Sequence, residues 1–295
     1  MKLIYYFLPG RGLFGGVKVA FQFIDLLTSL GVKIAAVLPD GRAPNWFFTT
    51  ADVFSEAQVW PRLTDKDWLM ITWPPDYWRL KNRGRLICHC QGTDDRMAPI
   101  FADRDVPILS CWRQAEEYIR NVHGRRTIPV GIAISDCFFY DGRLKWDNRV
   151  AYMPRRGWHL VKRCMKANLN LDYQPIDGMR EMSVSRSLMS SGVYLATSVG
   201  EQFGLPALEA MAAGCAVISV PVKGGLEYLL HEDNCLLVQP EALPKLLDWL
   251  MAPAQKALRR RFRTRAIATA NAYRLSVQRR KLVQLLEGEL SWIMK

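Results

Sequence analysis

The sequence predicts an α/β protein with two Rossmann-like, doubly wound domains that face each other across a cleft. The first observation behind this prediction is that short apolar runs, typical of buried parallel strands, alternate with segments of helical periodicity. The second is a single interruption between residues 135 and 148, which are polar and aromatic and contain the turn pair Asp141-Gly142. The third is size, because 295 residues with 49% hydrophobic content can form two cores of about 100–150 residues each.

The predicted N-terminal domain, residues 1–147, opens with a β-α-β unit. An apolar strand over Lys2–Leu8 is followed by a glycine-rich turn, a helix over Val17–Leu30 and a strand over Val32–Leu38. Further strands are predicted over Trp68–Thr72, Arg85–Cys90 and Val106–Leu109, with a helix over Gln114–Asn121.

The predicted C-terminal domain, residues 148–270, repeats the alternation. Its first strand, Val150–Met153, is followed by a helix over Trp158–Ala167. Regular alternation of strands and helices indicates parallel sheets covered on both faces. The remaining predictions are strands over Leu169–Tyr173, Val193–Thr197, Ala216–Val220 and Cys235–Val238, helices over Glu181–Ser191, Pro206–Ala213 and Leu226–Leu230, and helical structure from Leu243 on.

Composition argues against a membrane-spanning or disulfide-stabilised protein. No apolar run reaches the roughly 18–20 residues that cross a bilayer, and MKLIYYFLPG is typical of a first strand rather than a signal peptide, so a cytoplasmic location is predicted. The seven cysteines are odd in number and scattered. Cys88-His89-Cys90 lacks a second pair of ligands, which favours buried thiols over a zinc site.

The net charge of +12 favours phosphate-bearing partners. Part of the excess lies between Trp249 and Leu286, which hold ten basic residues and no acid, including Arg259-Arg260-Arg261. Two interpretations stay open: a solvated face of the C-terminal helices, or a surface for the anionic inner face of a membrane or for acceptor phosphates. Nucleic acid is not expected, because the charge is not interleaved with a recognisable binding motif.

The strongest candidate site is GEQFGLPALEAMAAGC, residues 200–215. Pro206 suits the first position of a helix and Gly214 the position after its end. The preceding loop, residues 198–205, then lies at the carboxyl edge of a parallel strand, where doubly wound folds bind ligands. Free amides around Gly204, Leu205 and Ala207, together with the helix dipole, predict a phosphate site.

Two carboxylates flank this loop. Glu209, predicted in the first helical turn, can lean toward the helix N-terminus and accept hydrogen bonds from ribose hydroxyls, and Glu201 can accept from hydroxyls beyond the phosphates. A nucleotide diphosphate that carries a sugar fits both. Its charge and that of the glutamates require cations, which Arg155, Arg156 and Lys162 supply after the neighbouring strand.

The motif E-x-F-G-L-P-x-x-E-A-M-A-x-G, from Glu201 to Gly214, resembles the E-x7-E motif of retaining glycosyltransferases with the GT-B fold, especially glycosyltransferase family 4. The resemblance is strong over about residues 149–240 and weak over the N-terminal half. It also includes Gly224-Gly225-Leu-Glu227-Tyr, Asn234-Cys-Leu-Leu-Val, the Gly15-Gly16 pair, and the spacing of Arg156 and Lys162, which matches the family's paired phosphate-binding Arg and Lys.

The resemblance implies a role for each matching residue. Glu201 is expected to contact the donor sugar and Glu209 the ribose, while the amides of Phe203, Gly204 and Leu205 hold sugar and phosphate. Arg156 and Lys162 are expected to stabilise the diphosphate leaving group, because charge develops on the departing phosphate. Gly16 is expected in the donor-binding glycine loop.

The resemblance further implies a metal-independent hexosyltransferase without a cofactor. Front-face attack would retain the anomeric configuration. The acceptor would be a glycan, lipid-linked or other molecule in bacterial-type glycoconjugate synthesis. A helix over residues 271–295 is expected to pack back on the N-terminal domain.

Two departures from the family pattern concern the donor site. A strand of the family often ends in His before Gly-Thr-Asp, whereas this sequence has Gln91 there and His89 two residues earlier, so either is a candidate contact for the donor sugar. Only about 35 residues separate Lys162 from Ser198, so one β-α unit is predicted to be missing and base recognition is left open.

Two other enzyme classes remain as alternatives. Gly10, Gly12 and Gly15 fit G-x-G-x-x-G after a strand, with Asp40 ending the second strand, which is the layout of an NAD(P)-dependent oxidoreductase. A sugar-nucleotide epimerase of related fold would recognise similar hydroxyl and diphosphate groups.

Overall fold

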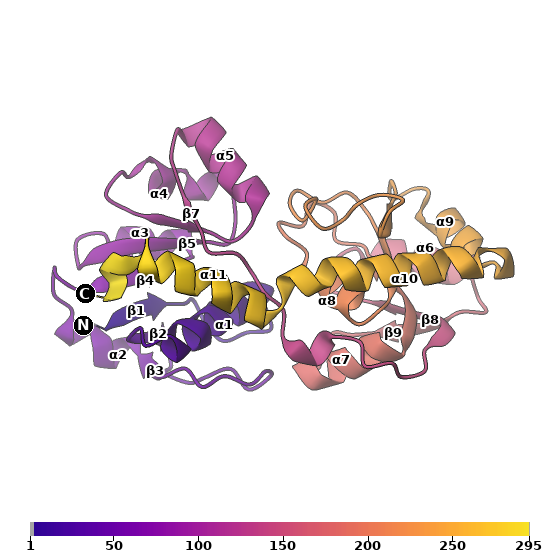
Figure 1. The fold of residues 1–295 in the computed structure, drawn as a ribbon, viewed down its shortest axis with the longest axis horizontal. Coiled ribbons are helices and arrows are strands. Elements are labelled where there is room, and N and C mark those ends of the chain that lie inside the picture. The colour runs from indigo at the N-terminus through magenta and orange to yellow at the C-terminus, as the bar shows by residue number, and fades with distance from the viewer. Residues whose placement is uncertain (1–2, 295) are drawn as a thin grey trace. The chain divides into compact units, whose positions relative to one another are not determined.

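The computed structural model describes residues 3–294, which form two compact units (Figure 1). Unit 1 combines Met1–Ala133 with Leu275–Lys295, and unit 2 is Ile134–Arg274. Each unit is built on one sheet whose strands all pair in parallel. The predicted α/β class, with two Rossmann-like units, is confirmed.

The sheet of unit 1 has seven strands in the order β3-β2-β1-β4-β5-β6-β7. Its connections reverse direction between β1 and β4, which is the topological switch point of a doubly wound sheet. The strands are β1 (Ile4–Phe7), β2 (Ile34–Leu38), β3 (Val53–Ser55), β4 (Trp68–Ile71), β5 (Arg85–Cys90), β6 (Ile108–Ser110) and β7 (Ile128–Pro129).

Helices cover this sheet and complete its core. The longest is α1, whose apolar residues Phe21, Phe23 and Ile24 are buried against the strands. From the C-terminal end of the chain, Leu282, Leu290 and Ile293 join the same core. The elements are α1 (Gly15–Ser29), α2 (Glu56–Val59), η1 (Trp60–Arg62), α3 (Pro74–Leu80), η2 (Asp95–Met97), α4 (Ala98–Ala102), α5 (Arg113–His123), α11 (Leu275–Glu287) and η6 (Ser291–Met294).

The sheet of unit 2 has five strands in the order β12-β11-β10-β8-β9. A doubly wound sheet of six strands has the order 3-2-1-4-5-6. Numbered in that way, β8 and β9 are strands 1 and 2 and β10 is strand 4, so the outer strand 3 is missing and β9 is an edge strand. This agrees with the predicted loss of one β-α unit. The strands are β8 (Trp146–Tyr152), β9 (Asp172–Pro175), β10 (Ser191–Ala196), β11 (Ala216–Ser219) and β12 (Cys235–Leu237).

The helices of unit 2 supply the other half of its core. Leu160 and Val161 of one helix and Leu243 and Leu247 of another pack on the apolar strands. The helices are η3 (Asp136–Phe138), α6 (Trp158–Ala167), α7 (Glu181–Ser190), α8 (Leu205–Ala212), α9 (Leu243–Met251), η4 (Pro253–Gln255), α10 (Lys256–Ala270) and η5 (Asn271–Tyr273).

The units divide at positions different from the predicted boundaries of 147/148 and 270/271. Residues 134–147 belong to unit 2, because Phe138 is buried and the Ser185 hydroxyl donates to the carbonyl of Cys137. The amide of Tyr140 also donates to the carbonyl of Ala212. A polar, aperiodic segment can pack on a domain as a fixed loop, and its sequence gives no sign of this.

The predicted helix over Leu226–Leu230 is wrong, and the chain forms turns there. Gly225 has a φ of +74°, and the Asn234 side chain takes over the local backbone groups. Its Oδ1 accepts from the amide of Leu230, and its Nδ2 donates to the carbonyl of Tyr228. A buried side-chain amide thus replaces the helical hydrogen bonds.

Candidate active site

The carboxyl ends of β8 and β10 form the centre of the candidate site. β8 leads through α6 toward β9, and β10 leads through α8 toward β11, so these two ends mark the switch point of unit 2. The loops after them touch. The Thr197 hydroxyl donates to the carbonyl of Arg156 at 3.0 Å, and a Cβ added to Gly157 would lie 2.1 Å from the carbonyl oxygen of Thr197.

The loop between β10 and α8 is held by hydrogen bonds from both sides. The amide of Gly200 donates to the carbonyl of Pro221, and the amide of Lys223 donates to the carbonyl of Glu201. The buried Tyr228 hydroxyl lies 2.9 Å from the carbonyl oxygen of Phe203 and 2.8 Å from that of Gly204. These contacts fix the path of the chain up to the start of the helix.

The N-terminus of α8 presents backbone amides. Gly204 precedes the helix with a φ of +87°, and Pro206 is its second residue and has no N–H. Among the described residues, none accepts a hydrogen bond from the amides of Gly204 and Leu205. The predicted contribution of Ala207 is wrong, because its amide donates to the carbonyl of Gly204. Two unpaired amides at a helix N-terminus favour an anion.

Glu201 and Arg156 meet beside this helix start. Arg156 Nη1 lies 3.0 Å from Glu201 Oε2, although the two residues come from different loops. The side chain of Arg156 is 64% exposed and that of Glu201 is 26% exposed. The structure therefore brings together the predicted cation and the predicted sugar-binding carboxylate in a place that solvent reaches.

Glu209 lies deeper than predicted. The helix starts at Leu205, so Glu209 is its fifth residue and begins the second turn rather than lying in the first. The residue is only 7% exposed. Burial raises the pKa of the Tyr194 hydroxyl, and the nearby charges of Glu209 and Glu201 raise it further. Both glutamates thus act on one buried tyrosine of β10.

The other two predicted cations, Arg155 and Lys162, have different surroundings. Arg155 Nε lies 2.6 Å from Asp177 Oδ1 in the loop after β9, and its positive charge lowers the pKa of Tyr194 against the larger effects of burial and the glutamates. Lys162 is exposed, and its Nζ lies 5.3 Å from the centre of the Trp158 ring. Both were predicted as cations of the site, Arg155 from its place after the strand and Lys162 also from its spacing to Arg156.

The predicted site residues of unit 1 lie around the start of α1. A Cβ added to Gly16 would lie 2.7 Å from Gln91 Oε1, so this glycine permits close packing of the Gln91 side chain. Gln91 Nε2 donates to the Tyr6 hydroxyl at 3.2 Å. Gln91 is partly exposed and can contact a ligand.

His89 lies in the core of unit 1. It is fully buried, it stacks on Phe23, and its ring nitrogens contact the Tyr6 hydroxyl and the Cys111 thiol. Burial lowers the pKa of His89 to about 3. A direct contact between His89 and a donor sugar does not fit this position, so of the two candidates only Gln91 stays.

Cys88 and Cys90 are buried free thiols. Burial raises the pKa of Cys90 to about 12. Within residues 3–294, no group of three or more His, Cys, Asp and Glu side chains is placed to hold a metal ion. In the same range, no helix is long and apolar enough to cross a membrane.

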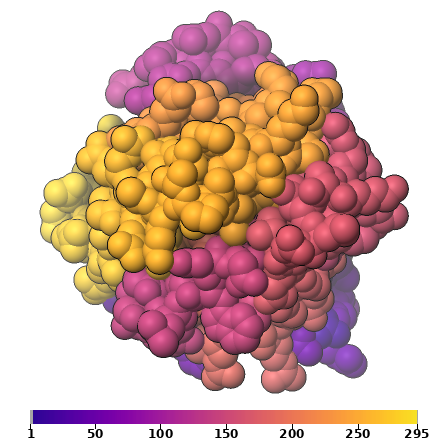
Figure 2. Space-filling view, turned by 90° about the vertical axis from the view of Figure 1, so that its right-hand side faces the viewer, coloured from indigo at the N-terminus to yellow at the C-terminus, as the bar shows by residue number. Residues whose placement is uncertain are grey.

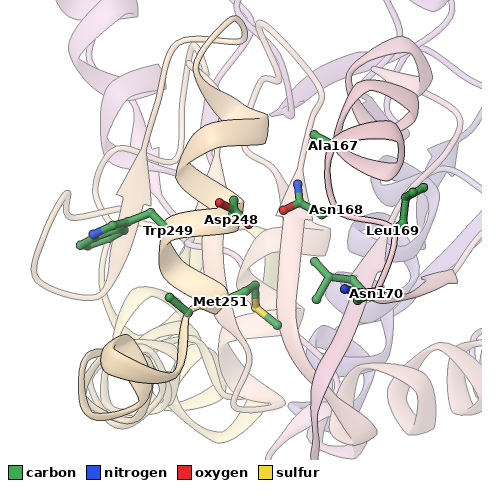
Figure 3. Close-up of a pocket in the computed structure, with 9 residues that line it drawn as sticks. Ala167, Asn168, Leu169, Asn170, Asp248, Trp249 and Met251 are labelled. Atoms are coloured by element: carbon green, nitrogen blue, oxygen red, sulfur yellow. The ribbon is translucent and has the colours of Figure 1, made fainter.

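A cavity of about 300 Å³ lies elsewhere in unit 2 (Figure 3). Its lining includes Asn168 and Asn170, after the end of α6, and Asp248, Trp249 and Met251 of α9. Because α6 begins at the carboxyl end of β8, its last residues lie at the opposite edge of the sheet. This cavity is therefore separate from the candidate site.

Comparison with known proteins points to one enzyme class. Residues 162–269 match the family model described as glycosyl transferases group 1, which covers unit 2 from α6 to α10. An uncharacterized glycosyltransferase from Methanocaldococcus jannaschii is 43% identical over 60 residues, a segment that spans 20% of this chain and 15% of that relative's length. Residues 162–269 of unit 2 are thus similar to the glycosyl transferases of group 1.

Solved structures share the fold over nearly the whole chain. Sucrose-phosphate synthase from Thermosynechococcus elongatus has a TM-score of 0.74 at 15% identity, covering 99% of this chain and 100% of that one. HepE from Anabaena, in complex with UDP and glucose, has a TM-score of 0.74 at 13% identity, covering 98% and 100%. The pneumococcal O-GlcNAc transferase GtfA, in complex with UDP and GlcNAc, has a TM-score of 0.69 at 10% identity, covering 97% and 98%. The fold is that of GT-B glycosyltransferases.

Proposed function

We propose that this chain is a retaining, metal-independent glycosyltransferase of the family 4 type that uses a nucleotide-diphosphate sugar. The observation that carries the proposal is the N-terminus of α8, where the unpaired amides of Gly204 and Leu205 lie beside the Arg156–Glu201 ion pair. Solved glycosyltransferases of the same fold in complex with UDP support a nucleoside diphosphate as the leaving group.

The diphosphate would bind at the helix start. Its oxygens accept hydrogen bonds from the two amides, and Arg156 turns from Glu201 to the phosphate as it arrives. Glu201 is then free to accept hydrogen bonds from hydroxyls of the donor sugar. Glu209, leaning toward the same helix end, accepts from the ribose.

The reaction would proceed on one face of the sugar. The acceptor hydroxyl oxygen bonds to the anomeric carbon as the bond from that carbon to the phosphate oxygen breaks, and the acceptor proton passes to the departing diphosphate. Arg155 and Arg156 stabilise the negative charge that develops on this leaving group, so that no metal ion is required.

The acceptor would be a glycan or a lipid-linked molecule of bacterial-type glycoconjugate synthesis. Gln91, beside the start of α1, is the candidate contact of unit 1 with the donor sugar. Peripheral attachment to the inner membrane face through the basic C-terminal region, in a cytoplasmic protein, remains part of the proposal.

The comparisons do not favour the dinucleotide oxidoreductase or the epimerase. Asp40, which follows β2, pairs with Arg11 of the glycine-rich turn at 2.9 Å, and the family match lies in unit 2. A calorimetric titration with UDP, GDP and NADH separates the oxidoreductase from the enzymes that use sugar nucleotides, because binding of NADH alone would support the oxidoreductase.

The direct test uses Glu201→Gln and Arg156→Ala. We expect each variant to reduce transfer from the preferred sugar nucleotide by about 100- to 1,000-fold, since each removes a charge that faces the reacting groups. The melting temperature should change little, because an exposed ion pair contributes at most about 1 kcal/mol to stability. Near wild-type turnover of either variant would refute the role of that residue.

A further inference from the structure

The missing outer strand of unit 2 removes one loop that could hold the nucleoside end of the donor. The carboxyl edge of this sheet ends with β9 and the short loop after it, where Asp177 is already paired with Arg155. A nucleobase that extends from the phosphate site toward this edge therefore needs another surface. This inference rests on the proposed function.

Trp158 provides such a surface. It is the first residue of α6, two positions after Arg156, and so it stands at the same carboxyl edge as the phosphate site. The residue is 39% exposed, although tryptophan is usually well buried. Tyr152, which is buried at the end of β8, stacks on it with ring centres 5.9 Å apart and an angle of 14° between the rings.

The support from Tyr152 fixes the orientation of the indole ring. A ring that is packed on another aromatic ring loses little further entropy when a ligand stacks on it. Lys162 Nζ lies 5.3 Å from the centre of the same ring, one helical turn along α6. The ammonium group thus lies against the aromatic surface.

We propose that Trp158 is the stacking platform for the base of the nucleoside diphosphate. Stacking requires only a flat aromatic face, so it holds purines and pyrimidines alike, whereas hydrogen bonds to base edges would distinguish them. The Lys162 side chain moves aside from the ring as the base arrives, and it stays close to the phosphates. Recognition of the base in this chain is therefore broad.

The test compares Trp158→Ala with two reference variants in the full-length protein. Trp158→Phe keeps an aromatic face. Trp249→Ala removes a tryptophan of similar exposure, 44%, from the opposite edge of the same sheet. Each protein is titrated by calorimetry with UDP, GDP, ADP and inorganic pyrophosphate, which has phosphates but no base.

We expect Trp158→Ala to weaken binding of each nucleoside diphosphate by about 5- to 150-fold. Pyrophosphate affinity should stay within about twofold, Trp158→Phe should keep most of the affinity, and Trp249→Ala should match the wild type. Unchanged affinity of Trp158→Ala for nucleotides, or an equal loss for pyrophosphate, would overturn the inference. If the wild-type protein binds no nucleoside diphosphate at all, the proposed function itself fails, and this result is distinct from a failure of the Trp158 variants alone.

Discussion

At the scale of single residues, the hydrogen bonds around His89 define its protonation state. Gln91 Nε2 donates to the Tyr6 hydroxyl, whose one proton is then left for His89 Nδ1, 2.7 Å away. When His89 Nδ1 accepts this proton, the ring proton sits on Nε2, which lies 3.1 Å from the Cys111 Sγ. A neutral imidazole with both nitrogens in hydrogen bonds suits a buried position. Protonation of His89 Nδ1 would place its N–H against the hydroxyl proton of Tyr6.

This arrangement predicts a pH dependence of stability. Burial lowers the pKa of His89 to about 3 in the folded protein, whereas an exposed histidine titrates near 6.5. Between these values the unfolded chain binds a proton that the folded one does not. The free energy of unfolding of unit 1 should fall as pH drops below about 6.5, by up to about 1.4 kcal/mol per pH unit from this residue.

Urea denaturation between pH 7 and pH 4 measures this slope, with His89→Gln as the comparison. The acidic side chains contribute to the slope in both proteins, so the difference between them isolates His89. Equal slopes, or a protonated His89 ring in the NMR spectrum at pH 5, would contradict the prediction.

The two candidate phosphate cations lead to a second prediction at this scale. Arg155 is fixed by Asp177 and acts electrostatically on Tyr194 at the site, whereas Lys162 lies over Trp158 on the surface of α6. We expect Arg155→Gln to weaken binding of pyrophosphate by about tenfold or more, as the loss of a charge-assisted hydrogen bond should. Lys162→Gln should have a smaller effect. Calorimetric titration ranks the two, and a larger loss for Lys162→Gln would restore the assignment made from motif spacing.

At the scale of elements, the close approach of the β8–α6 and β10–α8 loops depends on Gly157. Its φ is +74°, and the position of a Cβ is blocked by the Thr197 carbonyl at 2.1 Å. Gly178 is a matched control in the same unit, since its φ is +70° but nothing lies within 4 Å of an added Cβ. The two positions share the backbone strain and differ only in the clash.

We expect Gly178→Ala to lower the free energy of unfolding by about 1–2 kcal/mol, which is the usual cost of a left-handed backbone for alanine. Gly157→Ala should lower it by clearly more and should also abolish nucleotide binding, because the two loops must separate. Denaturant titration and calorimetry of both variants measure this. Equal destabilisation of the two would show that the loops adapt easily.

Elements with strong local signals were predictable from the sequence. β5 and α6 have the predicted bounds, and α8 is displaced by a single residue, since apolar periodicity and the Gly and Pro residues at the ends mark them. The short elements β3, α2 and α4 were missed, because a few residues show no periodicity. Leu226–Leu230 has a helical pattern, but hydrogen bonds from the buried side chain of Asn234, which follows it in the chain, decide its structure.

The candidate site was likewise predictable only in part from the sequence. The meeting of Arg156 and Glu201 was predictable, because both follow neighbouring strands of one parallel sheet. The contribution of Tyr228, which holds the loop at Phe203 and Gly204, was not, since it arises from packing between segments far apart in the chain. Likewise the depth of Glu209 depends on where α8 begins, and helix ends are poorly marked in sequence.

At the scale of the whole molecule, some of the basic side chains behind the net charge of +12 make hydrogen bonds and ion pairs within the fold. In α10, Arg259 donates to the carbonyls of Leu250 and Ala252, and Arg265 pairs with Asp233. Arg261 and Arg263 also donate to carbonyls of unit 2. The residues around α10 form a continuous part of the surface in Figure 2, where they are orange. Much of the basic stretch is thus structural, and its neutralisation would disturb the fold as well as any surface.

A sharper test of membrane attachment replaces arginines that make no hydrogen bond or ion pair among the described residues. Within the described part of the chain, Arg260, Arg279 and Arg280 are exposed and have no hydrogen bond or ion pair to another residue. If the basic region binds anionic lipid, replacing these three with Gln should weaken binding to phosphatidylglycerol vesicles by about 100-fold, since each basic residue near such a surface contributes about 1 kcal/mol. The melting temperature should not change. The Arg259→Gln/Arg261→Gln double variant should instead melt earlier, because the buried carbonyl of Leu250 loses its donor. Vesicle co-sedimentation at constant salt decides between the interpretations: undiminished binding of the triple variant would leave the basic stretch as a solvated and structural feature alone.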